Sequence, residues 1–254
     1  MQAHNNGDIT MHTTQMNTVP DHQRFVSLEK DWGDDDRFLL DFAGQSGTSA
    51  LQIACGTGAL SHALSQAGVE VVGVDRNPRK IAKAIRRTRA VTWVGADART
   101  IRLNRSFDTV VISGNAFHAF TTDTDQVLLL QTVAAHLKSG GRFAFGLLNP
   151  SAKPWEAWPA VERPMRVRSA DGEDVAFWQD FDGPDPTGLV RMKTHYDSRG
   201  EKCSMNKERR FVPKAHLMDL FRAVDLQPAA WYGDWDGSEA SEKSPYIIVT
   251  GRKL

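Results

Sequence analysis

Short apolar segments alternate with amphipathic segments between residues 50 and 150. The runs that suit buried strands are residues 50–54, 70–75, 91–95, 107–113 and 142–148. Between them, apolar residues recur about every 3.6 positions in 60–67, 78–89 and 124–137, which predicts helices. Gly68 and a turn at residues 139–141 are the expected ends of two of these helices. Strand and helix in alternation predict an α/β fold, a parallel sheet with helices on both faces.

The alternation stops after Pro154. Four runs with a period of two follow, at residues 164–169, 174–181, 188–197 and 202–212, and polar turns separate them. This pattern predicts an antiparallel β meander inserted into the α/β unit, which we call the lid. A helix at 213–224 and two strands, at 227–232 and 246–251, are expected to complete the core.

The chain is therefore expected to have four parts. Residues 1–20 are polar and predict a flexible tail, and residues 21–42 predict two helical pieces interrupted at Gly33. The α/β core with these N-terminal helices takes residues 21–150, and the inserted antiparallel lid takes 151–212. Residues 213–254 supply a C-terminal helix and the final β-hairpin of the core.

Composition excludes several classes of protein. The 254 residues include 41% hydrophobic and 24% charged residues, as in ordinary globular domains. No apolar run approaches the roughly 20 residues that span a bilayer, so no membrane segment is expected. The 31 basic and 31 acidic residues balance, so the chain lacks the overall positive charge expected of a dedicated nucleic-acid binder. The polar first 20 residues show no secretory signal, so a cytoplasmic protein is expected. Two distant cysteines predict no metal site.

One segment, residues 51–77, combines strand, glycine loop, helix, strand and a terminal acid. Gly56 and Gly58 let the backbone approach a ligand, and the following helix offers free N–H groups beside it. Asp75 ends the next strand, where a carboxylate can accept both hydroxyls of a ribose. The unit predicts an adenosine-type cofactor site. Ser61 stands where the dinucleotide fingerprint G-x-G-x-x-G has its third glycine.

The run LQIACGTG at residues 51–58 resembles motif I of class I S-adenosylmethionine-dependent methyltransferases, usually close to LDLGCGTG. Gln52 replaces the family's usual acid and Ala54 its first glycine. FDTVVISGNAFHAF at 107–120 resembles motif IV of the same family. The resemblance implies a Rossmann-like, seven-stranded, mostly parallel sheet that binds S-adenosylmethionine and releases S-adenosylhomocysteine. The lid is similar to that of glycine/sarcosine-type and amino-sugar N-methyltransferases.

The resemblance also implies which residues hold the cofactor. They follow the first four strands of the core: Ala54, Cys55, Gly56, Thr57, Gly58, Asp75, Arg76, Ala96, Asp97, Ala98, Ser113, Gly114 and Asn115. Asp75 is expected to bind the ribose hydroxyls and Asp97 the adenine amine. Cys55 is expected to pack rather than to react.

Methyl transfer to nitrogen or oxygen is an in-line displacement, in which positioning supplies much of the acceleration and a base helps when the acceptor is protonated. His118 is the predicted base, because it follows the fourth strand, in a loop at the carboxyl edge of the sheet, and its ordinary pKa of ~6.5 leaves it largely neutral. His195 or Tyr196 is a second catalytic candidate; the two adjoin in a lid strand, so at most one can face the acceptor. The residues expected to contact the acceptor are Phe117, His118, Trp178, Tyr196 and Trp231. Packing in the core is the alternative role for each aromatic residue.

We therefore expect methyl transfer to a small-molecule acceptor, at nitrogen rather than oxygen or carbon, with a homodimer through the lid as one arrangement. Three alternatives stay open. The stretch from Arg76 to Arg89 has seven basic residues and no acid, which suggests an RNA methyltransferase. The neutral overall charge counts against that alternative. An NAD(P)-dependent oxidoreductase is the second alternative, against which the missing third glycine of the dinucleotide fingerprint counts. A non-catalytic S-adenosylmethionine-binding protein is compatible with Gln52 and Ala54.

Overall fold

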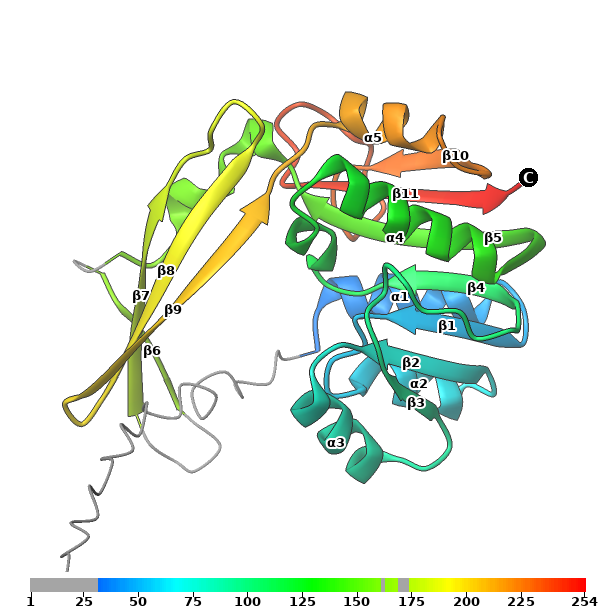
Figure 1. Ribbon diagram of the computed structural model, residues 1–254, viewed down its shortest axis with the longest axis horizontal. Coiled ribbons are helices and arrows are strands. Elements are labelled where there is room, and N and C mark those ends of the chain that lie inside the picture. The colour runs from blue at the N-terminus through cyan, green and yellow to red at the C-terminus, as the bar shows by residue number, and fades with distance from the viewer. Residues whose placement is uncertain (1–31, 161–162, 169–173) are drawn as a thin grey trace, which may run out of the picture.

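The computed structural model describes residues 32–160, 163–168 and 174–254, which form two β-sheets (Figure 1). The larger sheet has seven strands in the order β10-β11-β5-β4-β1-β2-β3. Their bounds are β1 (Ser49–Ile53), β2 (Glu70–Asp75), β3 (Thr92–Gly95), β4 (Phe107–Ile112), β5 (Leu137–Leu148), β10 (Leu226–Tyr232) and β11 (Tyr246–Lys253). Strands β1 to β5 pair in parallel, and β11 is antiparallel to both β5 and β10. The predicted seven-stranded, mostly parallel sheet is confirmed.

Helices cover both faces of this sheet. They are α1 (Asp34–Gly44), α2 (Ala59–Gln66), α3 (Pro78–Arg87), α4 (Asp123–His136) and α5 (Lys214–Phe221), with short 3-10 helices η2 (Ala116–Ala119), η3 (Pro150–Ala152) and η4 (Pro154–Ala157). Leu129 of α4 and Leu217 of α5 belong to one buried cluster, with Leu51 of β1. Leu39 of α1 and Leu60 of α2 belong to another, with Ala50 of β1. Neighbouring residues of β1 thus enter opposite layers, as the period-two alternation of a strand requires.

The smaller sheet is the predicted lid. Its strands are β6 (Met165–Arg168), β7 (Asp174–Asp182), β8 (Leu189–Ser198) and β9 (Glu201–Arg210), which pair antiparallel in that order. The lid faces the edge of the core at which the parallel strands β1 and β4 end (Figure 1). Val190, Met192 and Phe211 join it to the core by packing against Leu148, Trp155 and Trp158.

The prediction of a turn at residues 139–141 is wrong, because these residues lie within β5. Phe107 pairs with Leu137 and Thr109 with Arg142, so the residues between bulge out of the ladder. Gly140 has a φ of +72° there. A Cβ on Gly141 would lie 3.2 Å from the carbonyl oxygen of Asp108. The glycines therefore let the bulge stay against β4 instead of forming a free turn.

Of the two helical pieces predicted in residues 21–42, only the second lies within the described residues. Gly33 precedes α1, and its N–H donates to the carboxylate of Asp36 at 3.1 Å. The acidic run Asp34 to Asp36 forms the first turn, where carboxylates stabilise a helix. The tail predicted at 1–20 and the first helical piece lie outside the described residues.

Within the described ranges, no helix is long and apolar enough to cross a bilayer. The same residues hold no group of three or more potential metal-binding side chains. Cys55 and Cys203 are free thiols.

The carboxylate of Asp108 fixes the start of β1 against β4. Its Oδ2 accepts hydrogen bonds from the N–H of Thr48 at 3.2 Å and from the N–H and hydroxyl of Ser49 at 3.1 and 2.7 Å. Lys138 donates to Oδ1 at 2.8 Å. The bonds from Lys138 and Ser49 lower the pKa of Asp108 to about 2. Gly47 permits the close approach, because its φ is +134° and a Cβ would lie 2.4 Å from Cβ of Asp108.

Asp108→Asn should lower the free energy of unfolding at pH 7 by about 1 kcal/mol, a value that allows for solvent screening of a partly exposed group. Because folding depresses this pKa, the stabilisation is complete above the unfolded pKa of ~3.9 and is lost as the pH falls towards 2. Urea unfolding of both proteins from pH 7 to 2.5 measures it. The difference should shrink in acid, and a difference independent of pH would contradict the assignment.

Candidate functional site

The loop between β1 and α2 turns through three left-handed backbone positions. Ala54 and Gly56 both have a φ of +58°, and Gly58 has +85°. A Cβ on Gly58 would lie 2.3 Å from the ring of Trp93, whereas one on Gly56 would meet nothing within 4 Å. Gly58 is therefore needed for packing within the protein. Gly56 instead leaves open space over its backbone, a cradle that a ligand can fill.

Asp75 ties this loop to the ends of β2 and β3. The residue is 8% exposed. Its Oδ2 accepts from the N–H of Gly56 at 3.0 Å, and its Oδ1 accepts from the N–H of Asn77 at 2.8 Å. Its backbone oxygen accepts from the N–H of Ala96 at 3.2 Å. A carboxylate has about four acceptor positions, so two remain for a ligand, and ribose binding stays a prediction.

Asp97 is held by a cation of its own chain. Arg99 forms a salt bridge to it at 2.6 Å and another to Asp125 of α4 at 2.8 Å. The hydrogen bond from Arg99 is the main cause that lowers the pKa of Asp97 to about 2. The exposed Arg76 adds to this lowering by its charge. The adenine contact predicted for Asp97 stays a prediction, and an adenine amine would have to share the carboxylate with Arg99.

The amide of Gln52 explains one departure from the family motif. It is 2% exposed, donates through Nε2 to the hydroxyl of Ser113 at 2.6 Å and accepts from the hydroxyl of Ser61. One neutral side chain thus joins β1 to α2 and to the end of β4. Gly114, which follows Ser113, has a φ of +56° and open space where a Cβ would lie.

The predicted cofactor residues meet at one edge. They follow β4, β1, β2 and β3, which are neighbours in the sheet and end at its lid-facing edge (Figure 1). Burial, the largest cause, raises the pKa of Cys55 to about 12. Its thiol is therefore protonated at neutral pH, as suits a packing residue.

The predicted role of His118 as a general base is wrong. The residue is completely buried. Its Nδ1 lies 2.8 Å from the carbonyl oxygen of Arg210, and the N–H of Leu148 donates to its Nε2 at 2.9 Å. Burial lowers its pKa to about 4. Both nitrogens of a neutral ring are thereby used, so His118 joins the end of the lid to β5 instead of meeting an acceptor.

Phe117 is also corrected as an acceptor contact, whereas the role of Trp231 stays a prediction. Phe117 is completely buried in the core and stacks on Phe145 with ring centroids 5.1 Å apart. Trp231 lies on the edge strand β10, which three strands separate from β1. Its ring lies 4.7 Å from the ammonium of Lys214 in α5. Motif position located these rings along the chain but not their depth in the fold.

His195 and Tyr196 lie on opposite faces of the lid, as the alternation predicts. His195 pairs across the ladder with Trp178, and the two rings stack 5.2 Å apart. Its Nε2 lies 2.7 Å from the carboxylate of Asp180. Tyr196 shares the other face with Val190 and Met192, which contact the core. The packing of Val190 and Met192 favours Tyr196 over His195 and Trp178 at the acceptor, and the roles of all three stay predictions.

Sequence reasoning missed Lys207 and Arg209, which lie on the core-facing side of β9. Arg209 donates to the backbone oxygen of Asn115 at 3.4 Å, directly beyond β4. Burial lowers the pKa of both side chains. The signal was available, because Cys203, Met205, Lys207 and Arg209 alternate in one strand and must share a face.

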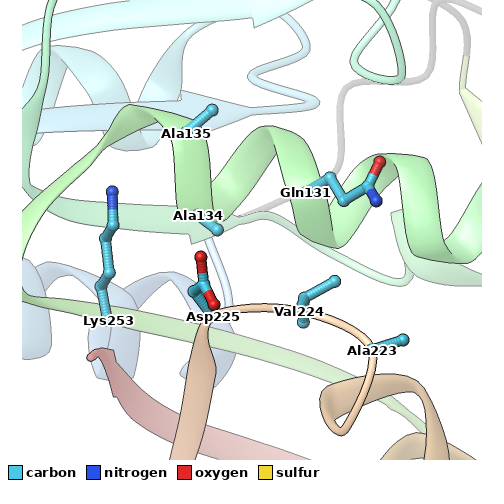
Figure 2. Close-up of a pocket in the computed structure, with 7 residues that line it drawn as sticks. All are labelled: Gln131, Ala134, Ala135, Ala223, Val224, Asp225 and Lys253. Atoms are coloured by element: carbon cyan, nitrogen blue, oxygen red, sulfur yellow. The ribbon is translucent and has the colours of Figure 1, made fainter.

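Two hollows of the described surface lie at the opposite edge. One is formed by α4, the segment just before β10 and the end of β11. Figure 2 shows its lining of Gln131, Ala134, Ala135, Ala223, Val224, Asp225 and Lys253. The other is lined by residues 102–106 with Ala135 and His136. Both lie where β4 and β5 begin, so neither coincides with the glycine cradle.

Comparison with known proteins finds similarity that includes the core. Residues 50–141 match the family model described as a methyltransferase domain. A cypemycin N-terminal methyltransferase from Streptomyces is 35% identical over 107 residues, which are 41% of this chain and 44% of that protein. A putative methyltransferase from Bacillus subtilis is 24% identical over 80% of this chain and 83% of its own length. The chain thus matches less than half of the first relative but most of the second.

Solved structures share the whole fold. An S-adenosylmethionine-dependent methyltransferase from Clostridium acetobutylicum has a TM-score of 0.75 at 16% identity, over 91% of this chain and 96% of its own. A sugar N-methyltransferase from Streptoalloteichus reaches 0.70 at 17% identity, over 99% of each chain. An S-adenosylmethionine-bound amino pentose methyltransferase from Micromonospora echinaspora reaches 0.67 at 19%, over 99% of this chain and 100% of its own. The predicted resemblance to S-adenosylmethionine-dependent methyltransferases is confirmed.

Ala54→Gly should raise the free energy of unfolding by about 0.5–1 kcal/mol. The left-handed conformation costs an L-residue roughly 1–2 kcal/mol, of which the backbone entropy of glycine removes about 0.5–1 kcal/mol. Ala50→Gly in β1 is the matched control and should lower stability by about 1 kcal/mol. Urea denaturation measures both variants. Destabilisation by Ala54→Gly would show that the loop is not strained there.

His118→Gln should lower stability at pH 7 by about 1–3 kcal/mol, because it disturbs two buried hydrogen bonds. Folding lowers the pKa of His118, so the wild type is penalised as the pH falls from ~6.5 towards 4, whereas the variant is not. The gap in stability should therefore narrow by about 2 kcal/mol at pH 4.5. Unfolding titrations at the two pH values decide it. A constant gap would mean that the ring is accessible to protons.

Proposed function

We propose that this methyltransferase transfers the methyl group of S-adenosylmethionine to a nitrogen atom of a small molecule. The observation that carries the proposal is the open cradle at Gly56 beside the carboxylate of Asp75. An uncrowded glycine backbone can approach the cofactor, and the remaining lone pairs of Asp75 suit ribose hydroxyls. S-adenosylmethionine supplies the electrophilic methyl group on its sulfonium.

The contribution of this chain is positioning. The cradle holds one reactant at the ends of β1 and β2, and the lid lies opposite that edge (Figure 1). An acceptor between them would be held for in-line attack and shielded from water. Such orientation can remove a large part of the activation barrier of a bimolecular reaction. A covered edge of this kind favours a small molecule over a nucleic acid.

The chemistry of the lid favours nitrogen over oxygen. The neighbours of Lys207 on the core-facing side are Met192, Thr194, Met205 and Arg209, none of which is a carboxylate or an imidazole. An alcohol oxygen needs a base to give up its proton, whereas a neutral amine offers its lone pair directly. Nearby cations also disfavour a protonated acceptor and lower the pKa of an amine. Two of the similar proteins are named as methyltransferases of a sugar nitrogen and of an N-terminus.

Gly56→Ala should weaken binding of S-adenosylhomocysteine at least tenfold, because a methyl group would occupy the cradle. Gly200→Ala is the matched control, since Gly200 has a φ of +86° with equally open space but lies in the lid turn between β8 and β9. Both should lose about 1 kcal/mol of stability from backbone strain. Calorimetric titration measures the affinity, which should stay within about twofold in the control.

Wild-type protein that binds neither S-adenosylmethionine nor S-adenosylhomocysteine would overturn the proposal. Release of S-adenosylhomocysteine during incubation with a panel of primary amines, measured by mass spectrometry, tests catalysis. Cofactor binding without turnover on amines would instead favour the non-catalytic alternative, and turnover on alcohols alone would refute the preference for nitrogen.

A further inference from the structure

Lys207 and Arg209 are directed at the cofactor edge by strand geometry. They are two residues apart in β9, so they share a face with about 7 Å between their backbone positions. The contact from Arg209 to the backbone oxygen of Asn115 shows that this face looks towards the end of β4. Arg210, on the opposite face, forms an ion pair with Asp123.

These two cations have no carboxylate partner among the residues that the structure describes. Other arginines of the chain do have one, as Arg99 pairs with Asp97 and Arg105 with Glu70. Glu208 lies between them in sequence but pairs with Arg191 at 3.4 Å on the other face. A cation that is partly removed from water without a counter-charge is destabilising.

A third cation lies within electrostatic reach. The pKa of Lys207 is lowered by burial and then by the charges of Arg209 and Lys80. Lys80 of α3 also lowers the pKa of Cys55, in the loop that forms the glycine cradle. The positive cluster therefore lies at the predicted cofactor edge and not elsewhere on the lid. The three cations repel one another, and a ligand that brings negative charge would explain why they lie together at this edge.

We propose that Lys207 and Arg209 bind an oxyanion of the acceptor, a carboxylate or a phosphate, and thereby restrict the enzyme to anionic acceptors. The guanidinium can form two parallel hydrogen bonds to such a group, and the ammonium adds a point charge. Because the oxyanion is anchored on the lid, the acceptor nitrogen stays free to face the methyl group. The inference rests on the proposed function, which defines this edge as the acceptor site.

Titration of inorganic phosphate into protein saturated with S-adenosylhomocysteine, at constant ionic strength, tests the proposal. Phosphate should bind the wild type, and Lys207→Gln and Arg209→Gln should each weaken it about tenfold. Lys193→Gln is the matched control, since Lys193 is an exposed lid cation on the opposite face of β8. The phosphate affinity of that variant should stay within about twofold of the wild-type value. The affinity for S-adenosylhomocysteine should be unchanged in all three variants.

Two results would overturn the proposal. Wild-type protein without phosphate affinity, or equal affinity in all variants, would mean that the cations hold no oxyanion. A tenfold loss of affinity for S-adenosylhomocysteine in Lys207→Gln would mean that they hold the carboxylate of the cofactor. Lys207 makes no hydrogen bond to another described residue, so Lys207→Gln decides the matter if Arg209→Gln, which loses its contact with Asn115, fails to fold.

The phosphate titration is repeated without S-adenosylhomocysteine. If the wild type binds no cofactor, the proposed function fails, whereas variant-sensitive phosphate binding would still support an oxyanion site at Lys207 and Arg209. Loss of phosphate binding with normal cofactor binding would leave the proposed function intact and refute this inference alone.

Discussion

The arrangement of the cofactor edge depends on the buried carboxylate of Asp75. It accepts hydrogen bonds from Gly56 in one loop and from Asn77 in the next, and its backbone accepts from Ala96 in a third. A buried carboxylate is tolerated only when such bonds are made, so the three loops cannot move independently. The open backbone at Gly56 keeps its position because Asp75 holds its N–H. The strain at Ala54 and the amide of Gln52 surround the same point.

The lid meets this edge with two kinds of surface. Near the joint, Val190, Met192 and Phe211 pack against the end of β5, and this apolar contact stabilises the junction. On the neighbouring strand of the same face, Lys207 and Arg209 pair across the ladder with Met192 and Val190 and present charge without a described counter-charge. Apolar packing can hold the lid in place at the joint, which allows the adjoining cations to remain unpaired until a ligand arrives. The apolar contact and the cations thus lie on neighbouring strands of one face of the lid.

Periodicity predicted the elements because each pattern is local, and the strand–helix alternation predicted their parallel order. It could not predict contacts between distant segments. His118 was chosen for its place after β4, but Arg210, 92 residues away, encloses it. Alternation placed His195 and Tyr196 on opposite faces, and only the packing of Met192 against the core shows which face is inward. The glycine bulge in β5 and the left-handed Ala54 likewise depend on neighbouring strands, so sequence pattern alone gave no sign of them.

The most direct test of the cofactor site is a crystal structure with S-adenosylhomocysteine bound. The ribose hydroxyls should lie within hydrogen-bond distance of the carboxylate of Asp75, and the cofactor should lie against the backbone of Gly56. Its sulfur should face the side of the lid that carries Lys207 and Arg209. Electron density for the cofactor at any other edge, or a ribose that does not contact Asp75, would contradict this placement.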